Sequence, residues 1–211
     1  MENSKKISFE VIKRLPRYYR YLGELCDSGV TRISSKELSE KMSVTASQIR
    51  QDLNCFGGFG QQGYGYNVEA LYNEIGKILG LNRGHKMIIV GAGNLGRALA
   101  SYKSFERRGF KLVGVFDNDP KKIGSYIGEY PILDIKALED FTKENKPDIA
   151  IIAVPKTEAG EVALRLSHLG IRGLLNFSYT DIKVPEGVEI ENVHLSDSLM
   201  TLSYRIKNKK Q

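Results

Sequence analysis

Cysteine and long apolar runs are both scarce in this chain of 211 residues. Cys26 and Cys55 are its two cysteines, too few for a disulfide framework. The longest apolar stretches, at 87–90 and 149–154, fall far short of the roughly 18 residues that a membrane span needs. The first residues contain no apolar segment of the kind that secretion signals carry. We therefore expect a cytoplasmic protein with no membrane partner.

The body of the chain has no excess of positive charge, although the formal net charge is +6. Residues 1–20 carry six basic and two acidic side chains, and residues 205–211 carry four basic and none acidic. The 184 residues between them hold 21 basic and 23 acidic side chains. A basic end is often a solvated tail, but a folded basic segment is a typical contact surface for phosphate. The charge therefore makes the first residues a candidate nucleic-acid surface.

The first half of the chain, residues 1–82, has a helical pattern. Residues 9–27 place apolar side chains on one side of a helix and basic side chains, Arg14 and Arg20 among them, on much of the rest. Pro16 is unfavourable inside a helix, so we expect the helix proper to start near that residue. Two short helices should follow, because Ser34 precedes Glu37 and Thr45 precedes Gln48 at the spacing of a capping box.

Two short helices joined by a tight turn are typical of a helix-turn-helix. The second helix, about 46–54, should expose polar side chains that can read base edges in a major groove, with Arg suited to guanine and Gln to adenine. These candidate DNA contacts are Ser47, Gln48, Arg50 and Gln51. The alternative interpretation is an ordinary helical hairpin with a polar outer face.

A glycine-rich segment follows the proposed recognition helix. Residues 55–68 contain five glycines interleaved with aromatic residues, a composition that excludes a helix and favours a short hairpin. A hairpin at this place is the wing of a winged helix, which contacts the DNA backbone or the minor groove. A flexible linker is the alternative. We assign Gln61, Gln62 and Tyr64 of the wing, and Arg14 of the first helix, as further DNA contacts.

The pattern changes at Lys86, where an apolar strand at 87–90 leads into the sequence GAGNLG and a helical stretch at 97–105. This strand–loop–helix context is the one that the dinucleotide-binding motif requires. The first glycine permits a tight turn, the second lets the backbone approach a pyrophosphate, and the third lets helix and strand pack closely. The predicted cofactor contacts in this loop are Gly91, Ala92, Gly93, Asn94, Leu95 and Gly96.

An acidic residue ends the next predicted strand, at 111–116. Asp117 lies 26 positions after Gly91, roughly where the acid that binds the adenosine ribose is expected. A carboxylate there accepts a bond from the 2′-hydroxyl and repels a 2′-phosphate, so it favours NAD(H) over NADP(H). The basic residues Lys121 and Lys122 weaken the argument against NADP(H), and a plain surface turn is the alternative.

The rest of the chain alternates between strands and helices. We predict strands at 149–154, 173–176 and 188–190 and helices at 136–144 and 158–169, which indicates a doubly wound parallel sheet over 83–195. Val154 and Pro155, at the end of one strand, are further predicted cofactor contacts. A last helix within 196–211 has apolar residues that must be covered by its own sheet or by a second subunit.

Catalytic residues are scarce in this half. The histidines, His85, His168 and His194, form no recognisable dyad. Tyr179 and Lys183 have the Tyr-x-x-x-Lys spacing of short-chain dehydrogenases, but a proline follows closely and predicts a loop rather than a helix. The sheet uses all of the roughly 126 residues from Lys86 onward, which leaves no substrate domain. We therefore expect a regulator that senses NADH and NAD+, not an enzyme.

Two alternatives to that function stay open. The first is an NAD-dependent oxidoreductase with an accessory domain. The second is a regulator that binds CoA or another nucleotide, because the phosphate loop does not identify the nucleotide.

Nearly the whole chain resembles the Rex family of redox-sensing transcriptional repressors. The stretches that carry the resemblance are RLPRYYRYL, RISSKELSE, VTASQIRQDL, FGGFGQQGYGYNV, GAGNLGRALASY, FDNDPKKIG, AIIAVP, GIRGLLNF and VPEGVEIENV. The resemblance implies a winged helix followed by a Rossmann domain, and a homodimer whose C-terminal helices (here 196–211) are swapped between subunits. It also implies repression at a near-palindromic operator and release from DNA when NADH rises.

The resemblance also implies roles for single residues. Arg50 would contact the major groove, and Tyr102 would act in a switch between the domains together with Arg20. This chain departs from the family pattern at Gln51 and Gln62, where basic residues are usual, and at His194, where an acid usually completes the switch. Fewer positive charges should flatten the salt dependence of DNA binding. A histidine at position 194 makes pH sensitivity of the switch a hypothesis, which a DNA-release curve unchanged between pH 6 and 8 would eliminate.

Overall fold

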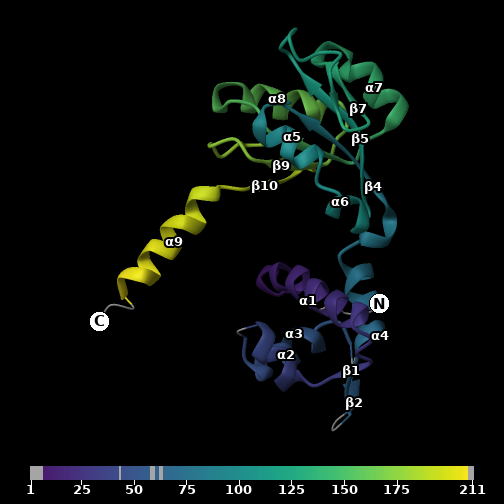
Figure 1. The fold of residues 1–211 in the computed structure, drawn as a ribbon, viewed down its shortest axis with the longest axis vertical. Coiled ribbons are helices and arrows are strands. Elements are labelled where there is room, and N and C mark those ends of the chain that lie inside the picture. Colours follow the sequence, from purple (N-terminus) through teal and green to yellow (C-terminus); the bar gives the residue numbers. More distant parts are fainter. Residues whose placement is uncertain (1–6, 43, 58–59, 62–63, 209–211) are drawn as a thin grey trace. The chain divides into compact units, whose positions relative to one another are not determined.

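The computed structural model describes residues 7–42, 44–57, 60–61 and 64–208 (Figure 1). The chain divides into two compact units, Met1–Asn82 and Arg83–Gln211. None of the described helices is long and apolar enough to cross a bilayer.

The first unit is a small helical domain with a three-stranded sheet in the order β1-β3-β2, all antiparallel. Its core is apolar and draws on α1, β1, α2, α3 and α4, with Leu15, Leu22, Ile49 and Ile75 fully buried. The strands β2 and β3 form the expected hairpin, so the winged-helix prediction is confirmed. The elements are α1 (Phe9–Asp27), β1 (Arg32–Ile33), α2 (Ser35–Met42), α3 (Ala46–Asn54), β2 (Gly60–Gln61), β3 (Gly65–Asn67) and α4 (Val68–Ile78).

The first helix corrects the sequence prediction. We expected α1 to start near Pro16, but it begins at Phe9 and runs through the proline. A proline inside a helix removes one hydrogen bond and costs roughly 3 kcal/mol. Val11 and Leu15, both before the proline, are buried, and Pro16 itself is exposed. Tertiary packing of the apolar face therefore outweighs the local preference of the chain.

The two capping boxes differ in the structure. At the start of α2 the Ser34 N–H donates to Glu37 Oε2 at 2.7 Å, and the Glu37 N–H donates to Ser34 Oγ at 3.1 Å. At the start of α3 the Thr45 hydroxyl oxygen accepts from the Gln48 N–H at 3.1 Å, but the Gln48 side chain donates to Asp52 instead of accepting from the Thr45 N–H. The first box is complete, and the second is half formed because Asp52 holds the Gln48 amide.

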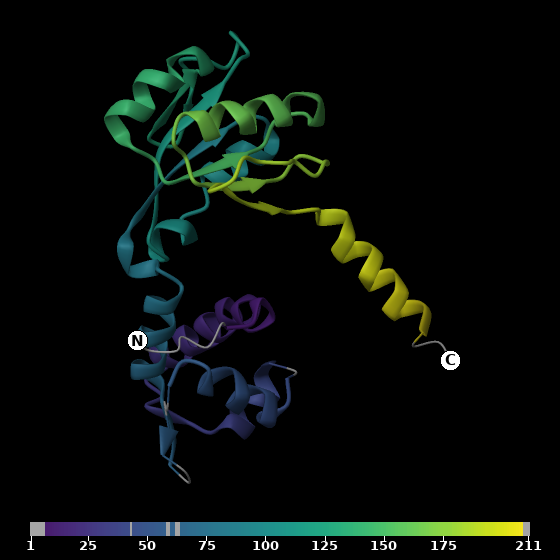
Figure 2. The same cartoon turned by 180° about the vertical axis from the view of Figure 1, so that it is seen from behind.

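The second unit contains a seven-stranded sheet in the order β10-β9-β8-β4-β5-β7-β6, parallel except for the β6–β7 pair. Helices cover both faces, as Figure 2 shows from behind: α7 and α8 pack on one apolar cluster, while α5 and α6 contribute to the other. The short helix η1 (Leu81–Arg83) spans the boundary between the units. The elements of the second unit are β4 (His85–Val90), α5 (Asn94–Ala100), α6 (Ser104–Arg107), β5 (Phe110–Asp117), β6 (Tyr126–Ile127), β7 (Tyr130–Asp134), η2 (Ile135–Ala137), α7 (Leu138–Asn145), β8 (Ile149–Ile152), α8 (Lys156–His168), β9 (Gly173–Asn176), β10 (Glu189–Asn192) and α9 (Leu195–Asn208).

The predicted doubly wound sheet is confirmed, with corrections to single elements. The stretch predicted as one helix at 97–105 forms two, α5 and α6, and the strand predicted to end at 154 ends at Ile152. The strands β6 and β7 were missed. β7 pairs with β6 at Tyr130 and Pro131 and with β5 from Ile132 onward, so both strands depend on partners elsewhere in the sheet.

The sheet order fixes where a ligand can bind. The chain runs from β4 outward to β5 and β7 on one side, then returns to β8 on the other side of β4. In open parallel sheets, ligands bind outside the carboxyl ends of the strands where the order reverses. That point lies between β4 and β8, where the GAGNLG loop begins.

The last helix, α9, has no buried residue, although it was predicted to need apolar cover. Figures 1 and 2 both show it clear of the sheet of its own unit. Leu195, Leu199, Leu202 and Ile206, all on one face of α9, are each more than half exposed.

Candidate functional site

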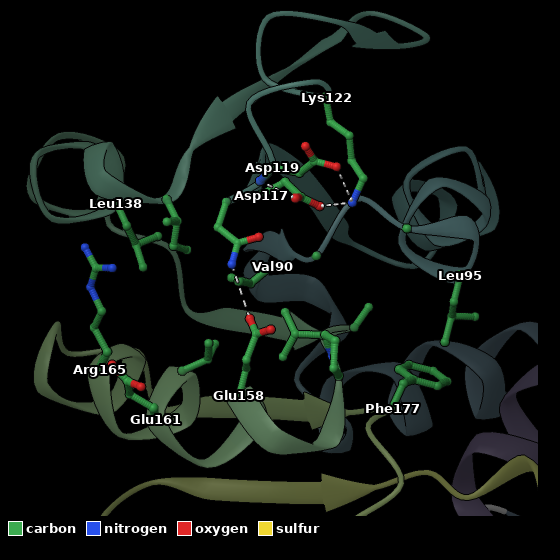
Figure 3. Close-up of a pocket in the computed structure, with 18 of the residues that line it drawn as sticks. Val90, Leu95, Asp117, Asp119, Lys122, Leu138, Glu158, Glu161, Arg165 and Phe177 are labelled. Atoms are coloured by element: carbon green, nitrogen blue, oxygen red, sulfur yellow. Dashed lines mark hydrogen bonds and ion pairs between the residues drawn. The ribbon is translucent and has the colours of Figure 1, made fainter.

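A cavity of about 820 Å³ lies at the carboxyl ends of β4, β5 and β8 (Figure 3). Its volume is within the range typical of small-molecule and cofactor sites. Apolar residues form much of its wall, and charged side chains stand at its edges. The lining residues are Val90, Gly91, Gly93, Asn94, Leu95, Asp117, Asn118, Asp119, Lys122, Ile135, Leu138, Ala153, Val154, Pro155, Glu158, Glu161, Val162, Arg165 and Phe177.

Three glycines shape the loop between β4 and α5. Gly91 has φ +103°, and a Cβ there would collide with the Ala153 carbonyl. A Cβ on Gly96 would collide with the carbonyl of Gly91. By contrast, a Cβ on Gly93 would meet nothing within 4 Å, so the cavity beside Gly93 is open. The loop is therefore a cradle with free space at its second glycine, which fits the pyrophosphate of a dinucleotide.

Asp117, predicted to bind the ribose, already accepts hydrogen bonds from the protein through both of its carboxylate oxygens. It is 5% exposed, and its Oδ2 accepts from the Ala92 N–H at 2.7 Å and from Lys122 Nζ at 3.0 Å. Its Oδ1 accepts from the Asp119 N–H at 2.8 Å. Burial alone would raise the pKa of Asp117, but these donors outweigh it and hold the pKa below its ordinary value. Its contact with a ribose stays a prediction, and the structure gives it a second role in fixing the phosphate loop.

Two residues that the sequence analysis missed close the cavity from opposite sides. Asn118 follows β5, and Glu158 lies in the first turn of α8. The Asn118 Nδ2 donates to Glu158 Oε2 at 3.3 Å, the dashed line that spans the hollow in Figure 3. The sequence does contain one signal for Glu158, since it follows the strand β8 at the same sheet edge as the glycine loop. Of the predicted contacts, Ala92 and Gly96 do not line the cavity, whereas Val154 and Pro155 do.

The proposed recognition helix α3 presents three of its predicted contacts to solvent. Ser47, Arg50 and Gln51 are exposed, and Arg50 Nη1 donates to Ser35 Oγ of α2 at 3.0 Å. In the wing, Tyr64 is 69% exposed. Gln61 belongs to β2, and Gln62 lies outside the described residues.

Gln48 and Arg14, also predicted to contact DNA, take part in a buried polar network around Asp52. Asp52 is 1% exposed, and its carboxylate accepts from Arg14 Nε at 2.7 Å and Arg14 Nη2 at 2.8 Å. The Tyr18 hydroxyl and Gln48 Nε2 each donate to it at 2.8 Å. Burial alone would raise the pKa of Asp52, but the bonds from Arg14, Gln48 and Tyr18 hold it below its ordinary value. Burial raises the pKa of Tyr18, and the hydrogen bond to Asp52 raises it further.

The residues predicted to form an interdomain switch belong to different units. Arg20 is exposed on α1, with its guanidinium 5.3 Å from the centre of the Tyr21 ring. Tyr102 is 55% exposed and packs edge-on against Phe105. His194 precedes α9, and its Nε2 lies 3.2 Å from Asp181 Oδ1, a carboxylate that the sequence analysis did not single out. The pairing of Arg20 with Tyr102 stays a prediction.

The other chemical candidates do not form a site. Tyr179 and Lys183 lie in a segment without helix, as the following proline predicted. Among the described residues, no group of His, Cys, Asp and Glu could hold a metal ion.

Two protein families match parts of the chain. Residues 6–54 match a family described as the N-terminus of putative DNA-binding proteins. Residues 82–180 match the CoA binding domain family.

The relatives found by sequence cover nearly the entire chain. Proteins named redox-sensing transcriptional repressor Rex are 57% identical in Clostridium perfringens strain 13 (99% of this chain, 98% of the relative) and 59% identical in Thermoanaerobacter pseudethanolicus (98% and 92%). The relative from Clostridioides difficile is 56% identical over the full length of both chains.

Solved structures agree with the sequence relatives. The repressor RSP, in complex with β-NAD+ and operator DNA, is 57% identical and superposes with a TM-score of 0.90 over 97% of this chain and 94% of that one. RSP in complex with β-NADH gives 54% identity and a TM-score of 0.89 over 98% and 97%. This chain therefore belongs to the Rex family of redox-sensing transcriptional repressors.

Proposed function

We propose that this chain is a DNA-binding transcriptional repressor that senses the NADH/NAD+ state and leaves its operator when NADH binds. The observation that carries this proposal is the pairing of two sites in one chain: a winged helix with an exposed polar recognition helix, and a sheet-edge cavity whose glycine cradle is open at Gly93. The relatives support it, because they are named redox-sensing repressors and RSP has been solved with NAD+, NADH and operator DNA.

In the second unit we assign the dinucleotide to the cavity of Figure 3. The backbone around Gly93 would receive the pyrophosphate, with Gly91 and Gly96 holding the loop in shape. The side of the cavity formed by residues 117–119 would receive the adenosine ribose, at the end of the second strand of the sheet. The ligand is sensed rather than consumed, and the proposal includes no catalytic residue.

In the first unit we assign base reading to the exposed face of α3, with Arg50 placed to reach guanine and Gln51 to reach adenine. Ser47 and the wing residues Gln61, Gln62 and Tyr64 would contact the sugar-phosphate backbone or the minor groove. Arg14 and Gln48 are held by Asp52, so we assign them first to the support of α3 and only second to DNA.

We propose a homodimer that binds a near-palindromic operator in the cytoplasm. The apolar face of α9 is uncovered within the chain, and a second copy would cover it. A two-fold dimer presents two recognition helices and therefore predicts a site with two related halves. For NADH to release DNA, the two units must have at least two relative arrangements, and NADH must favour the one that does not fit the operator.

One selection experiment tests the proposal. Duplexes bound from sheared genomic DNA are recovered, and NADH or an equal amount of NAD+ is then added. Recovery of near-palindromic sites that NADH releases and NAD+ does not would support the repressor. If no DNA is recovered while NADH still binds, the DNA-binding assignment is wrong and turnover of alcohols or hydroxy acids becomes the next assay. Displacement of NADH by CoA would favour the CoA-binding regulator instead.

A further inference from the structure

The cavity of the second unit carries more negative than positive charge. Four of its lining residues are acidic, Asp117, Asp119, Glu158 and Glu161, and two are basic, Lys122 and Arg165. The Lys122 ammonium is 3.0 Å from Asp117 Oδ2 and 3.8 Å from Asp119 Oδ2, so its charge is shared between two carboxylates on the same side of the cavity.

Asp117 is poorly placed to select the ligand by itself. Both of its oxygens already accept hydrogen bonds from Ala92, Asp119 and Lys122, and its side chain is 5% exposed. Its negative charge is partly neutralised by the ammonium group beside it. A carboxylate that rejects a second phosphate must face the cavity with its charge uncompensated, and another residue fits that description better.

Glu158 is that residue. It is partly buried at the start of α8, and the one hydrogen bond that its carboxylate accepts among the described residues comes from the neutral amide of Asn118. No described lysine or arginine forms an ion pair with it. Asn118 lies on the side of the cavity where the ribose of a dinucleotide is expected. Its amide nitrogen is 3.3 Å from Glu158 Oε2, so the Glu158 carboxylate is within reach of a ribose bound there (Figure 3).

We infer that Glu158 is a specificity-determining residue, which restricts the cavity to NAD(H) by repelling the 2′-phosphate of NADP(H) from the side opposite Asp117. The inference rests on the proposed NADH site and deepens it. A ribose 2′-hydroxyl can donate to the Glu158 carboxylate once the long bond from Asn118 opens. A 2′-phosphate at the same place would bring close to two negative charges against an unpaired carboxylate in a partly enclosed cavity.

The test compares the affinities of NADH and NADPH for the full chain and for Glu158→Gln, by titration calorimetry at low salt. Glutamine keeps the size of the side chain and its hydrogen-bonding ability but removes the charge. NADPH should bind the variant about tenfold more tightly than it binds the parent, while the affinity for NADH changes much less. The gain for NADPH should shrink when the salt concentration is raised, since it is electrostatic.

Glu161→Gln is the matched control, because Glu161 has the same charge and lies on the same helix but is exposed to solvent. It should leave the ratio of the two affinities nearly unchanged. The inference is overturned if Glu158→Gln leaves that ratio at the parent value, or if both glutamine variants change it equally. If the parent chain binds no NADH, the proposed function itself fails, and that result is separate from the comparison of variants.

Discussion

The carboxylate of Asp52 accepts four hydrogen bonds inside the first unit, from Arg14, Tyr18 and Gln48. Removal of its charge would leave the Arg14 guanidinium without a partner beside a buried site. Since breaking a buried ion pair is costly, we expect Asp52→Asn to destabilise this unit by about 3 kcal/mol. Hydrogen exchange in peptides from α1 and α3 measures this, and it should speed up by about a hundredfold.

Tyr18→Phe is the control for that change, because it removes one hydrogen bond and keeps the Arg14–Asp52 pair. It should cost about 1 kcal/mol. Exchange in the second unit should be the same in both variants. Equal effects of the two substitutions on α1 and α3 would contradict the central role of the Asp52 charge.

Acid should destabilise both units through their buried aspartates. The folded state holds the pKa of Asp52 and of Asp117 below the ordinary value of 3.8. Each therefore contributes stability that is fully present above that value and is lost as the pH falls through the lower, folded-state pKa. The measurement is hydrogen exchange between pH 7 and pH 3. In Asp52→Asn the extra acid sensitivity of α1 and α3 should be absent, and a parent chain with equal protection across this range would refute the prediction.

The types of residue that lie on a surface can be predicted from the sequence more readily than the contacts between particular side chains. Arg14 and Gln48 were predicted as DNA contacts because basic and amide side chains stood on polar faces of helices. Their shared partner, Asp52, lies 38 positions from Arg14 and its burial cannot be read from a helical pattern. Asp117 was found by its position after a strand, but the three donors that occupy it depend on the tertiary fold.

At the scale of elements, the glycine loop allows a test of the predicted roles. Gly93→Ala should leave the thermal stability of the chain unchanged, since a Cβ there meets no atom within 4 Å. The same methyl group would occupy space that we assign to the pyrophosphate. Crowding of this kind costs about 1–3 kcal/mol, so the affinity for NADH should fall about 5- to 150-fold in a titration.

Gly96→Ala provides the contrast within the same loop. A Cβ at this position would collide with the Gly91 carbonyl, so the loop and α5 must shift. This variant should lower the melting temperature as well as the affinity for NADH. If Gly93→Ala binds NADH as tightly as the parent chain does, the assignment of the pyrophosphate to the space beside Gly93 is wrong.

Elements with local signals were predicted, and elements that depend on distant partners were not. The capping box at Ser34, the glycine-rich hairpin and the strand before GAGNLG each have a signature within a few residues. The strand β7 is stabilised by pairing with β5, which no local pattern reveals, and α1 continues through Pro16 because its apolar face is buried. The second capping box is only half formed for a local reason, since Asp52, one turn further along the same helix, accepts a hydrogen bond from the Gln48 side chain.

At the scale of the molecule, the sequence indicates two units because its pattern changes from helical to alternating near residue 83, where the structure also divides the chain. The second unit does not bury the apolar face of its own last helix, α9. Leu195, Leu199, Leu202 and Ile206 recur at the spacing of one helix face, and each is more than half exposed. Their exposure in a single chain is the physical reason to expect that the function requires a second copy.

The dimer can be tested by placing a charge on that face. Leu202→Lys should shift the chain from dimer to monomer in sedimentation at micromolar concentration, since a buried lysine without a partner is costly. Operator affinity should fall with it, because a monomer contacts only one half-site, while NADH affinity in the second unit should change little. Thr201→Lys adds the same charge one position away, off the apolar face, and should weaken the dimer much less. A chain that stays dimeric with Lys at 202 would show that another surface joins the two copies.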